Sequence, residues 1–127
     1  MRTEKEMMEL IIGTAQNDER IRGVYMNGSR TNPNASKDVF QDYDIVYVVR
    51  ETASFIEDEQ WIDIFGERLY MQMPERNDRL MGRESDWENC YGYLMQMADG
   101  NRIDLHVVTL DYAKKDIEFS SNTNLSI

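Results

Sequence analysis

The stretch DYDIVYVV at residues 42–49 is the feature that most limits how this chain can fold. Its apolar, mostly β-branched second part favours a β-strand. Because side chains alternate between the two sides of a strand, Asp42 and Asp44 share one side, with Cα atoms about 6.6 Å apart. Two like charges on one side of a strand are unfavourable without a counter-charge. The stretch therefore predicts a strand that begins at a site for something cationic.

The rest of the chain alternates between helical and strand-like patterns. Thr3 and Glu6 form a capping-box pair at the start of a helix, and Asp99-Gly100 is a hairpin signal between two strands. The patterns predict strands over residues 21–27, 43–49, 67–73, 90–97 and 102–109. They predict helices over residues 3–16, 52–65 and 110–119, and a loop with at most one helical turn over residues 76–87. This order predicts an α/β (α+β) fold with a mixed five-stranded sheet flanked by helices.

Length and charge limit the class of protein. With 127 residues, 41% of them hydrophobic, residues 1–127 are expected to form one domain around a single core. The net charge is −10 and no Lys/Arg-rich block is present, which disfavours DNA or RNA as a partner and favours a metal ion or a small cationic ligand. The alternative is a well-solvated acidic surface.

The chain has the features of a cytoplasmic protein without a membrane span. Its N-terminal residues are charged, and no apolar run approaches the roughly 18 residues that a span needs. The single cysteine, Cys90, cannot form an intramolecular disulfide, which fits a reducing compartment. We expect Cys90 to be a buried strand residue rather than a nucleophile.

Residues that suit phosphate oxygens follow the first predicted strand. Gly28 permits a tight turn and a close approach of the backbone, and Ser29 offers a hydroxyl and an N–H. Arg30 can add a charge-assisted contact, although a salt bridge to Asp38 or Asp42 is an alternative.

A third acidic residue, Asp104, lies between apolar residues in the last predicted strand. If that strand neighbours residues 42–49, three carboxylates converge, and Mg²⁺ is the cation that such oxygen ligands and phosphates favour. Paired metal ions stabilise the attacking and leaving oxygens of phosphoryl or nucleotidyl transfer. The residues therefore predict a metal site for a nucleoside triphosphate. His106 has the same parity as Asp104, and for it we favour a structural role, because hard-metal sites seldom use imidazole.

The motifs named above resemble a known signature. Gly28-Ser29, Asp42-Tyr43-Asp44-Ile45 and Ile103-Asp104-Leu105 are similar to the signature of the polymerase-beta-like nucleotidyltransferase superfamily. More narrowly, GSRTNP, FQDYDIVYVV, WIDIFGERLYMQ and NRIDLHVV resemble the N-terminal domain of the bacterial aminoglycoside 6-adenylyltransferases.

This resemblance implies the nucleotidyltransferase fold and the transfer of AMP from ATP to a hydroxyl of an aminoglycoside such as streptomycin, with release of pyrophosphate. It further implies that Asp42 and Asp44 hold the catalytic Mg²⁺ pair and that Asp104 completes the site at the attacking hydroxyl. By the same resemblance, Gly28, Ser29 and Arg30 hold the triphosphate of ATP.

The family continues into a second, mainly helical domain that helps to bind the aminoglycoside, and this chain stops soon after residues 110–119. Two alternatives to a complete enzyme therefore stay open. One is a module that binds metal and nucleotide but needs a partner chain or a homodimer for the acceptor, and the other is an inactive remnant.

Several large side chains are expected to pack in the core rather than to clamp an adenine ring. They are Trp61, Phe65, Tyr70, Met71 and Met73. Trp87, in the irregular segment, is a candidate to cover an interface with a missing domain.

Overall fold

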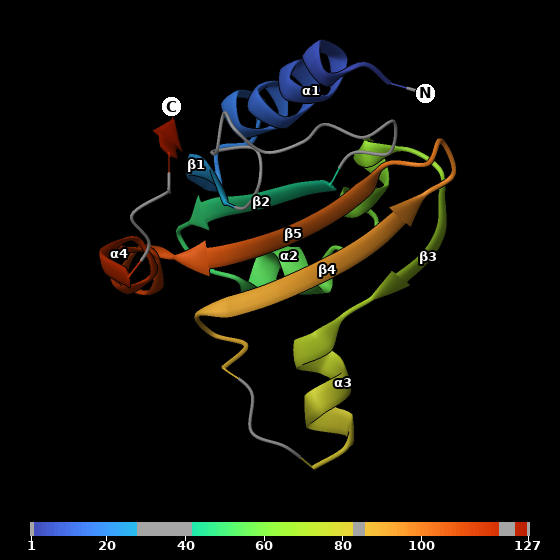
Figure 1. Ribbon diagram of the computed structural model, residues 1–127. Helices are drawn as coiled ribbons and strands as arrows, with labels where there is room; N and C mark the ends of the chain where they lie inside the picture. Colours follow the sequence, from blue (N-terminus) through green and yellow to red (C-terminus); the bar gives the residue numbers. More distant parts are fainter. Residues whose placement is uncertain (1, 28–41, 83–85, 120–123, 127) are drawn as a thin grey trace.

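The fold is a mixed sheet with helices on both sides (Figure 1). The structure is a computed structural model and describes residues 2–27, 42–82, 86–119 and 124–126. The helices are α1 (Glu4–Asn17), α2 (Ala53–Glu57), the 3₁₀ helix η2 (Trp61–Phe65), α3 (Pro74–Leu80) and α4 (Leu110–Phe119). The strands are β1 (Ile21–Asn27), β2 (Asp42–Val49), β3 (Arg68–Gln72), β4 (Cys90–Met97), β5 (Arg102–Thr109) and β6 (Asn124–Ser126).

The described strands form one sheet in the order β3-β4-β5-β2-β1-β6. Strands β2 and β5 run parallel, and the other neighbours run antiparallel. The mixed sheet and its five predicted strands are therefore confirmed, and the three-residue strand β6 adds a sixth strand beside β1. Within the described part of the chain, no helix is both long and apolar enough to cross a membrane.

The two faces of the sheet differ in chemistry. On β2, Tyr43, Ile45 and Tyr47 are buried on one side, which we call the core face. Asp42 and Asp44 lie on the other side, which we call the aspartate face, because side chains alternate along a strand.

Helices α1, α2 and η2 cover the core face. Their buried side chains join one cluster with the inward side chains of the sheet, and these helix residues are Met7, Ile11, Ala15, Phe55, Trp61, Ile62 and Phe65. On the aspartate face, α4 contributes Ala113 to a smaller apolar cluster with Val46, Val48 and Val108. This smaller cluster lies toward the C-terminal ends of β2 and β5, so the N-terminal ends of these strands carry the polar part of the face.

The capping box of α1 is confirmed. The Glu6 N–H donates to Thr3 Oγ1, and the Thr3 N–H donates to Glu6 Oε1, both at 3.1 Å. The helix is then tied to the sheet, because the Tyr47 hydroxyl donates to the carbonyl of Ile11 at 2.7 Å. The local signal and the tertiary contact agree in this part of the fold.

The single helix predicted over residues 52–65 is wrong, because the segment breaks into α2 and η2. On a continuous α-helix, Phe55 and Trp61 would point about 120° apart. The break brings both rings into the core, where their centroids lie 4.9 Å apart in an edge-to-face arrangement. Aromatic packing therefore outweighs helical continuity.

The loop predicted over residues 76–87 is also wrong in part, because α3 runs from Pro74 to Leu80. Pro74 directly follows the strand predicted over residues 67–73 and is the first residue of this helix, where its missing N–H costs nothing.

The aromatic predictions have a mixed outcome. Trp61 and Phe65 are in the core, and Met71 and Met73 pack partly buried against it. Tyr70 is 57% exposed on the edge strand β3, so its predicted core position is wrong. Trp87 packs edge-to-face on Tyr91 and donates its indole N–H to the Glu75 carbonyl at 3.0 Å. The prediction that Trp87 covers an interface with a further domain stays a prediction.

Candidate functional site

The three predicted aspartates come together on the aspartate face. Strands β2 and β5 are parallel neighbours (Figure 1), with Asp44 opposite Asp104 and Asp42 opposite Arg102. Directly opposite residues of paired strands have side chains on the same side of the sheet. The convergence of Asp42, Asp44 and Asp104 that depended on this strand pairing is therefore present, while their roles as metal ligands stay a prediction.

Asp44 is the most strongly perturbed carboxyl of this group. Its pKa is raised from 3.8 to about 6, first by burial, then by the charge of Asp104 and a hydrogen bond with it, and then by the charge of Asp42. The positive charge of Arg102 opposes this rise. Burial and the neighbouring charges therefore disfavour the ionised form of Asp44, and a bound cation would favour it.

Arg102 is a site residue that the sequence analysis missed. Its Nε donates to Asp104 Oδ1 at 3.1 Å, and its side chain is 49% exposed. The signal was present in the sequence, because residues two apart on a strand share a side, and Arg102 stands two residues before Asp104. Arg102 thus supplies part of the positive charge that the sequence predicted beside the aspartates.

The predicted triphosphate-binding residues Gly28, Ser29 and Arg30 lie outside the described residues. The last residue of β1, Asn27, is the register partner of Asp44. The position before Gly28 is therefore next to the carboxylate cluster.

His106 and Cys90 also lie on the aspartate face. His106 is two residues after Asp104, and its Nε2 lies 3.9 Å from Glu75 Oε1. Cys90 is buried in β4, as predicted, and its pKa is raised to about 12, mainly by burial and secondly by the charge of Glu75. Cys90 is therefore a protonated thiol at neutral pH, which disfavours a role as nucleophile.

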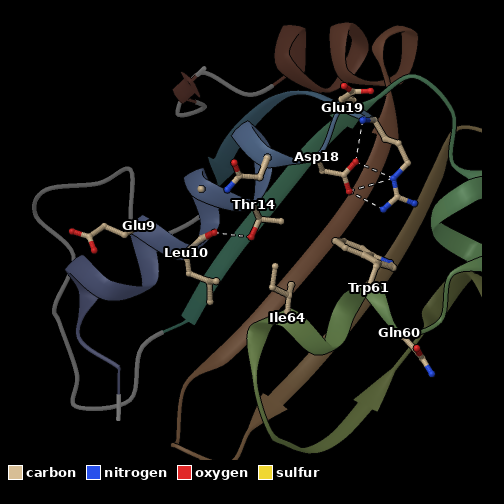
Figure 2. Close-up of a pocket in the computed structure, with 11 residues that line it drawn as sticks. Glu9, Leu10, Thr14, Asp18, Glu19, Gln60, Trp61 and Ile64 are labelled. Carbon is tan, nitrogen blue, oxygen red and sulfur yellow. Dashed lines mark hydrogen bonds and ion pairs between the residues drawn. The ribbon is translucent and has the colours of Figure 1, made fainter.

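A groove on the other side of the molecule was considered as an alternative site. It has a volume of about 810 Å³ and lies between α1 and η2, where Leu10, Trp61 and Ile64 line it (Figure 2). Asp18 at this groove is already bonded to Arg20. We assign the candidate site to the aspartate face, because the carboxyl with the raised pKa lies there.

Comparison with known proteins gives consistent matches. The family model described as streptomycin adenylyltransferase matches residues 1–125. The chain is 42% identical over 125 residues to the aminoglycoside 6-adenylyltransferase of Bacillus subtilis (strain 168), covering 98% of this chain and 42% of that protein. It is 42% identical over 111 residues to the enzyme of the same name from Campylobacter jejuni, covering 87% of this chain and 37% of that protein.

A solved structure has the same fold. The crystal structure of an aminoglycoside 6-adenyltransferase from Bacillus subtilis matches with a TM-score of 0.72 and 33% sequence identity. The match covers 93% of this chain and 39% of that chain. The chain thus spans about two fifths of the length of the relatives it matches.

Proposed function

The chain belongs to the streptomycin adenylyltransferase family, and from this premise we propose that it transfers AMP from ATP to a hydroxyl of an aminoglycoside such as streptomycin. The observation that carries the proposal is the meeting of Asp42, Asp44 and Asp104 on one face of the sheet. The names of the relatives, aminoglycoside 6-adenylyltransferases, support the reaction class. With ATP as the donor, the proposed reaction belongs in the cytoplasm.

The donor set of the cluster fits Mg²⁺. Carboxylate oxygens are the ligands that this ion prefers. The pKa of Asp44, raised first by burial and then by Asp104 and Asp42, supports a site at which a cation would favour the ionised carboxyl. Asp42 and Asp44 would hold the ion, and Asp104 would complete the site near the acceptor hydroxyl. When bound, Mg²⁺ supplies neutralisation of the triphosphate and of the charge that develops during transfer.

The remaining work falls to residues that position the substrates. We propose that Gly28, Ser29 and Arg30 bind the triphosphate and that Arg102 orients Asp104 through the hydrogen bond from its Nε. The acceptor hydroxyl oxygen forms a bond to the α-phosphorus, the bond from that phosphorus to the β-phosphate oxygen breaks, and pyrophosphate leaves. The hydroxyl proton passes to a base. Such an in-line displacement depends on positioning and charge neutralisation rather than on a protein nucleophile.

The test is a turnover assay. The 127-residue chain is mixed with ATP, Mg²⁺ and streptomycin, pyrophosphate release is followed, and the adenylylated product is detected by mass spectrometry. We expect product with the unchanged chain and with Asp111→Asn, which removes an exposed carboxylate on α4. We expect at least about a 100-fold loss with Asp42→Asn, since charge neutralisation at the metal site is worth several kcal/mol. Turnover by Asp42→Asn at the rate of the unchanged chain would overturn the site assignment.

The carboxylate cluster also supports a second candidate function. This chain, which aligns with about two fifths of the length of its relatives, would then act as a metal- and nucleotide-binding module that needs a partner chain or a homodimer for the acceptor. Binding of ATP with Mg²⁺ but without turnover would support this module. Absence of binding would support an inactive remnant.

A further inference from the structure

A second group of metal-ligand side chains lies beside the aspartate cluster. It consists of Glu75 on α3, Cys90 on β4 and His106 on β5, and its ligand atoms all lie within 4.8 Å of one another. Cys90 Sγ is 3.8 Å from Glu75 Oε1, and His106 Nε2 is 3.9 Å from the same oxygen. We call this group the Glu-Cys-His cluster.

The sheet register places two of these residues on one face. Cys90 is opposite Val108, and Gly92 is opposite His106, so the side chains of Cys90 and His106 both lie on the aspartate face. This meeting could not be inferred from the sequence, because it depends on the pairing of β4 with β5. The pairing makes neighbours of residues sixteen positions apart.

Helix α3 brings the carboxylate. Glu75 Oε2 accepts a hydrogen bond from the Gly92 N–H at 2.9 Å, which fixes the carboxylate over β4. Gly92 is also what leaves space for the cluster, since a Cβ there would lie 2.6 Å from His106 Nε2 and 3.1 Å from Glu75 Oε2. A side chain at position 92 would therefore displace the imidazole and crowd the carboxylate.

We propose that the Glu-Cys-His cluster binds one borderline transition-metal ion, of which Zn²⁺ is the representative. Thiolate, imidazole and carboxylate are the ligands that Zn²⁺ takes in proteins, usually in tetrahedral geometry. Bond lengths of about 2.0–2.3 Å put tetrahedral ligand atoms roughly 3.3–3.8 Å apart, so side-chain shifts of about 1 Å complete the site. Water takes the fourth position, and the thiol proton is released to solvent on binding.

The cluster can be reached from solvent. The side chains of His106 and Glu75 are 30% and 17% exposed, whereas Cys90 is buried behind them. An ion can therefore enter past the imidazole and the carboxylate. Once bound, it would link α3 to β4 and β5 and so stabilise the folded chain.

The Glu-Cys-His cluster is chemically distinct from the three aspartates. The aspartates offer only carboxylate oxygens, which suit Mg²⁺, whereas sulfur and nitrogen ligands suit Zn²⁺. The proposal is thus independent of the adenylyl-transfer function.

The test measures metal binding directly. The untagged chain is treated with a chelator and then titrated with Zn²⁺ by calorimetry, with and without saturating Mg²⁺. We expect one Zn²⁺ per chain, unaffected by Mg²⁺, and a rise in the thermal unfolding midpoint. With Co²⁺ as a spectroscopic substitute, we expect a near-ultraviolet charge-transfer band from the thiolate.

Variants assign the ligands. Cys90→Ser should remove the Co²⁺ charge-transfer band. Glu75→Gln, whose amide oxygen can still accept from Gly92, should weaken Zn²⁺ binding by at least about tenfold, because even residues that only orient a metal ligand cost about that much when they are changed. Glu88→Gln, an exposed glutamate two residues before Cys90, is the matched control and should bind as the unchanged chain does. Asp44→Asn should also keep its Zn²⁺ affinity.

Three results would overturn the proposal. They are no stoichiometric Zn²⁺ binding, a Co²⁺ complex without the thiolate band, or a folded Glu75→Gln variant with unchanged affinity. Far-ultraviolet circular dichroism confirms the fold of each variant. If Cys90→Ser does not fold, Glu75→Gln alone decides the outcome.

Discussion

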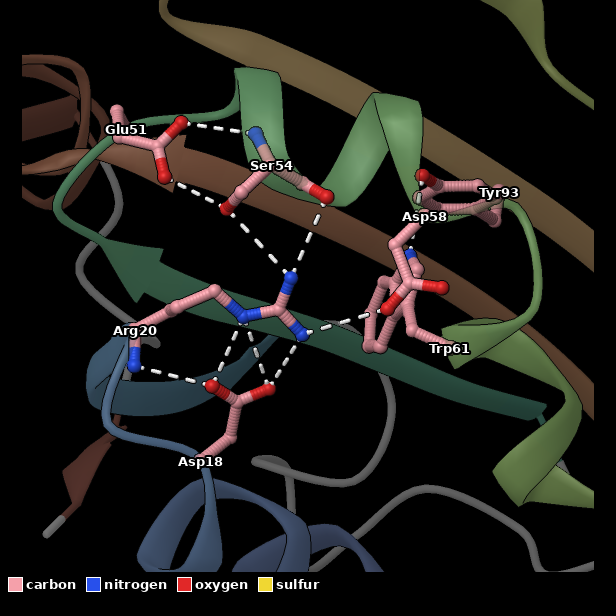
Figure 3. Close-up of polar contacts among 7 residues, drawn as sticks. All are labelled: Asp18, Arg20, Glu51, Ser54, Asp58, Trp61 and Tyr93. Atoms are coloured by element: carbon pink, nitrogen blue, oxygen red, sulfur yellow. Dashed lines mark hydrogen bonds and ion pairs between the residues drawn. The ribbon is translucent and has the colours of Figure 1, made fainter.

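Two groups of carboxylates in this fold differ in how their charge is compensated. Beside the core face, Asp18 accepts hydrogen bonds from Arg20 Nε at 3.0 Å and from Arg20 Nη2 at 2.7 Å, and this interaction lowers the pKa of Asp18 (Figure 3). On the aspartate face, burial and the neighbouring acids raise the pKa of Asp44 to about 6. The first group is balanced by Arg20, and the second contains a carboxyl whose ionised form is disfavoured.

The balanced group stabilises the fold. Arg20 Nη1 donates to the Ser54 carbonyl at 3.3 Å, and the guanidinium lies 4.0 Å from the centroid of the Phe55 ring. Arg20 therefore ties the turn after α1 to helix α2. Asp58 adds a longer ion pair at 3.8 Å.

The three aspartates on the aspartate face have a cost in the folded state that a bound ligand can reduce. Asp44, Asp104 and Asp42 repel one another, and Arg102 offsets only part of that repulsion. The difference teaches where to look for function, because carboxyls with a raised pKa are typical of sites that bind or react.

The largest expected effect separates binding from stability. Asp44→Asn should lower the affinity for ATP with Mg²⁺ by about 100-fold or more, because one of three charged ligands is lost. The free energy of unfolding should stay equal or rise, since a repelling charge is gone. Calorimetric titration and urea unfolding measure the two quantities. If Asp44→Asn binds ATP with Mg²⁺ as tightly as the unchanged chain, the two groups of carboxylates do not differ in function.

The next effect tests the balanced group. Arg20→Met should lower the free energy of unfolding by about 2–3 kcal/mol, because Asp18 loses a charged partner and Phe55 loses a cation–π contact. Affinity for ATP with Mg²⁺ should not change. Urea unfolding measures the loss, and Arg22→Met, which alters an exposed arginine of β1, is the control. Equal stability of the two variants would show that the Arg20 contacts contribute little.

The pH dependence of stability should differ between the groups. A carboxyl whose pKa is raised in the folded state stabilises the protein below its unfolded pKa and loses that contribution as pH rises through the folded pKa. For Asp44 this window runs from 3.8 to about 6. The pKa of Asp18 is lowered in the folded state. Its contribution to stability is therefore present above pH 3.8 and is lost as the pH falls further.

Between pH 4 and pH 7, the unchanged chain should therefore lose about 1–2 kcal/mol of unfolding free energy relative to Asp44→Asn, a figure reduced from the full shift because Asp44 is partly exposed to screening solvent. Urea unfolding of both proteins across this range measures the difference. Parallel stability curves would contradict the raised pKa.

The sequence predicted the fold wherever a local signal agreed with the tertiary contacts. Thr3 and Glu6 mark the start of α1, and Asp99-Gly100 marks the turn between β4 and β5. The break between α2 and η2 could not be predicted, because it is decided by the packing of Phe55 on Trp61. Helix α3 was not predicted because Pro74 is compatible both with the end of a strand and with the start of a helix.

For the candidate site, strand alternation alone placed Asp42 and Asp44 on one side. The place of Asp104 depends on β5 pairing with β2, a contact between residues sixty apart that the pattern allows but does not require. The Glu-Cys-His cluster needs a helix and two strands to meet, so the sequence pattern gave no signal for it. Local sequence patterns do not show which strands are neighbours in the sheet.

The smallest expected effect compares the two arginines. Arg102 contacts Asp104 much as Arg20 contacts Asp18, but the Arg102 side chain is 49% exposed and that of Arg20 is 29% exposed. Because solvent screens exposed pairs, Arg102→Gln should change the free energy of unfolding by less than about 0.5 kcal/mol. The same variant should raise the pKa of Asp44 further, since Arg102 is the charge that lowers it. Carboxyl titration by NMR follows this rise. A large loss of stability without movement of the Asp44 pKa would mean that Arg102, like Arg20, serves the fold.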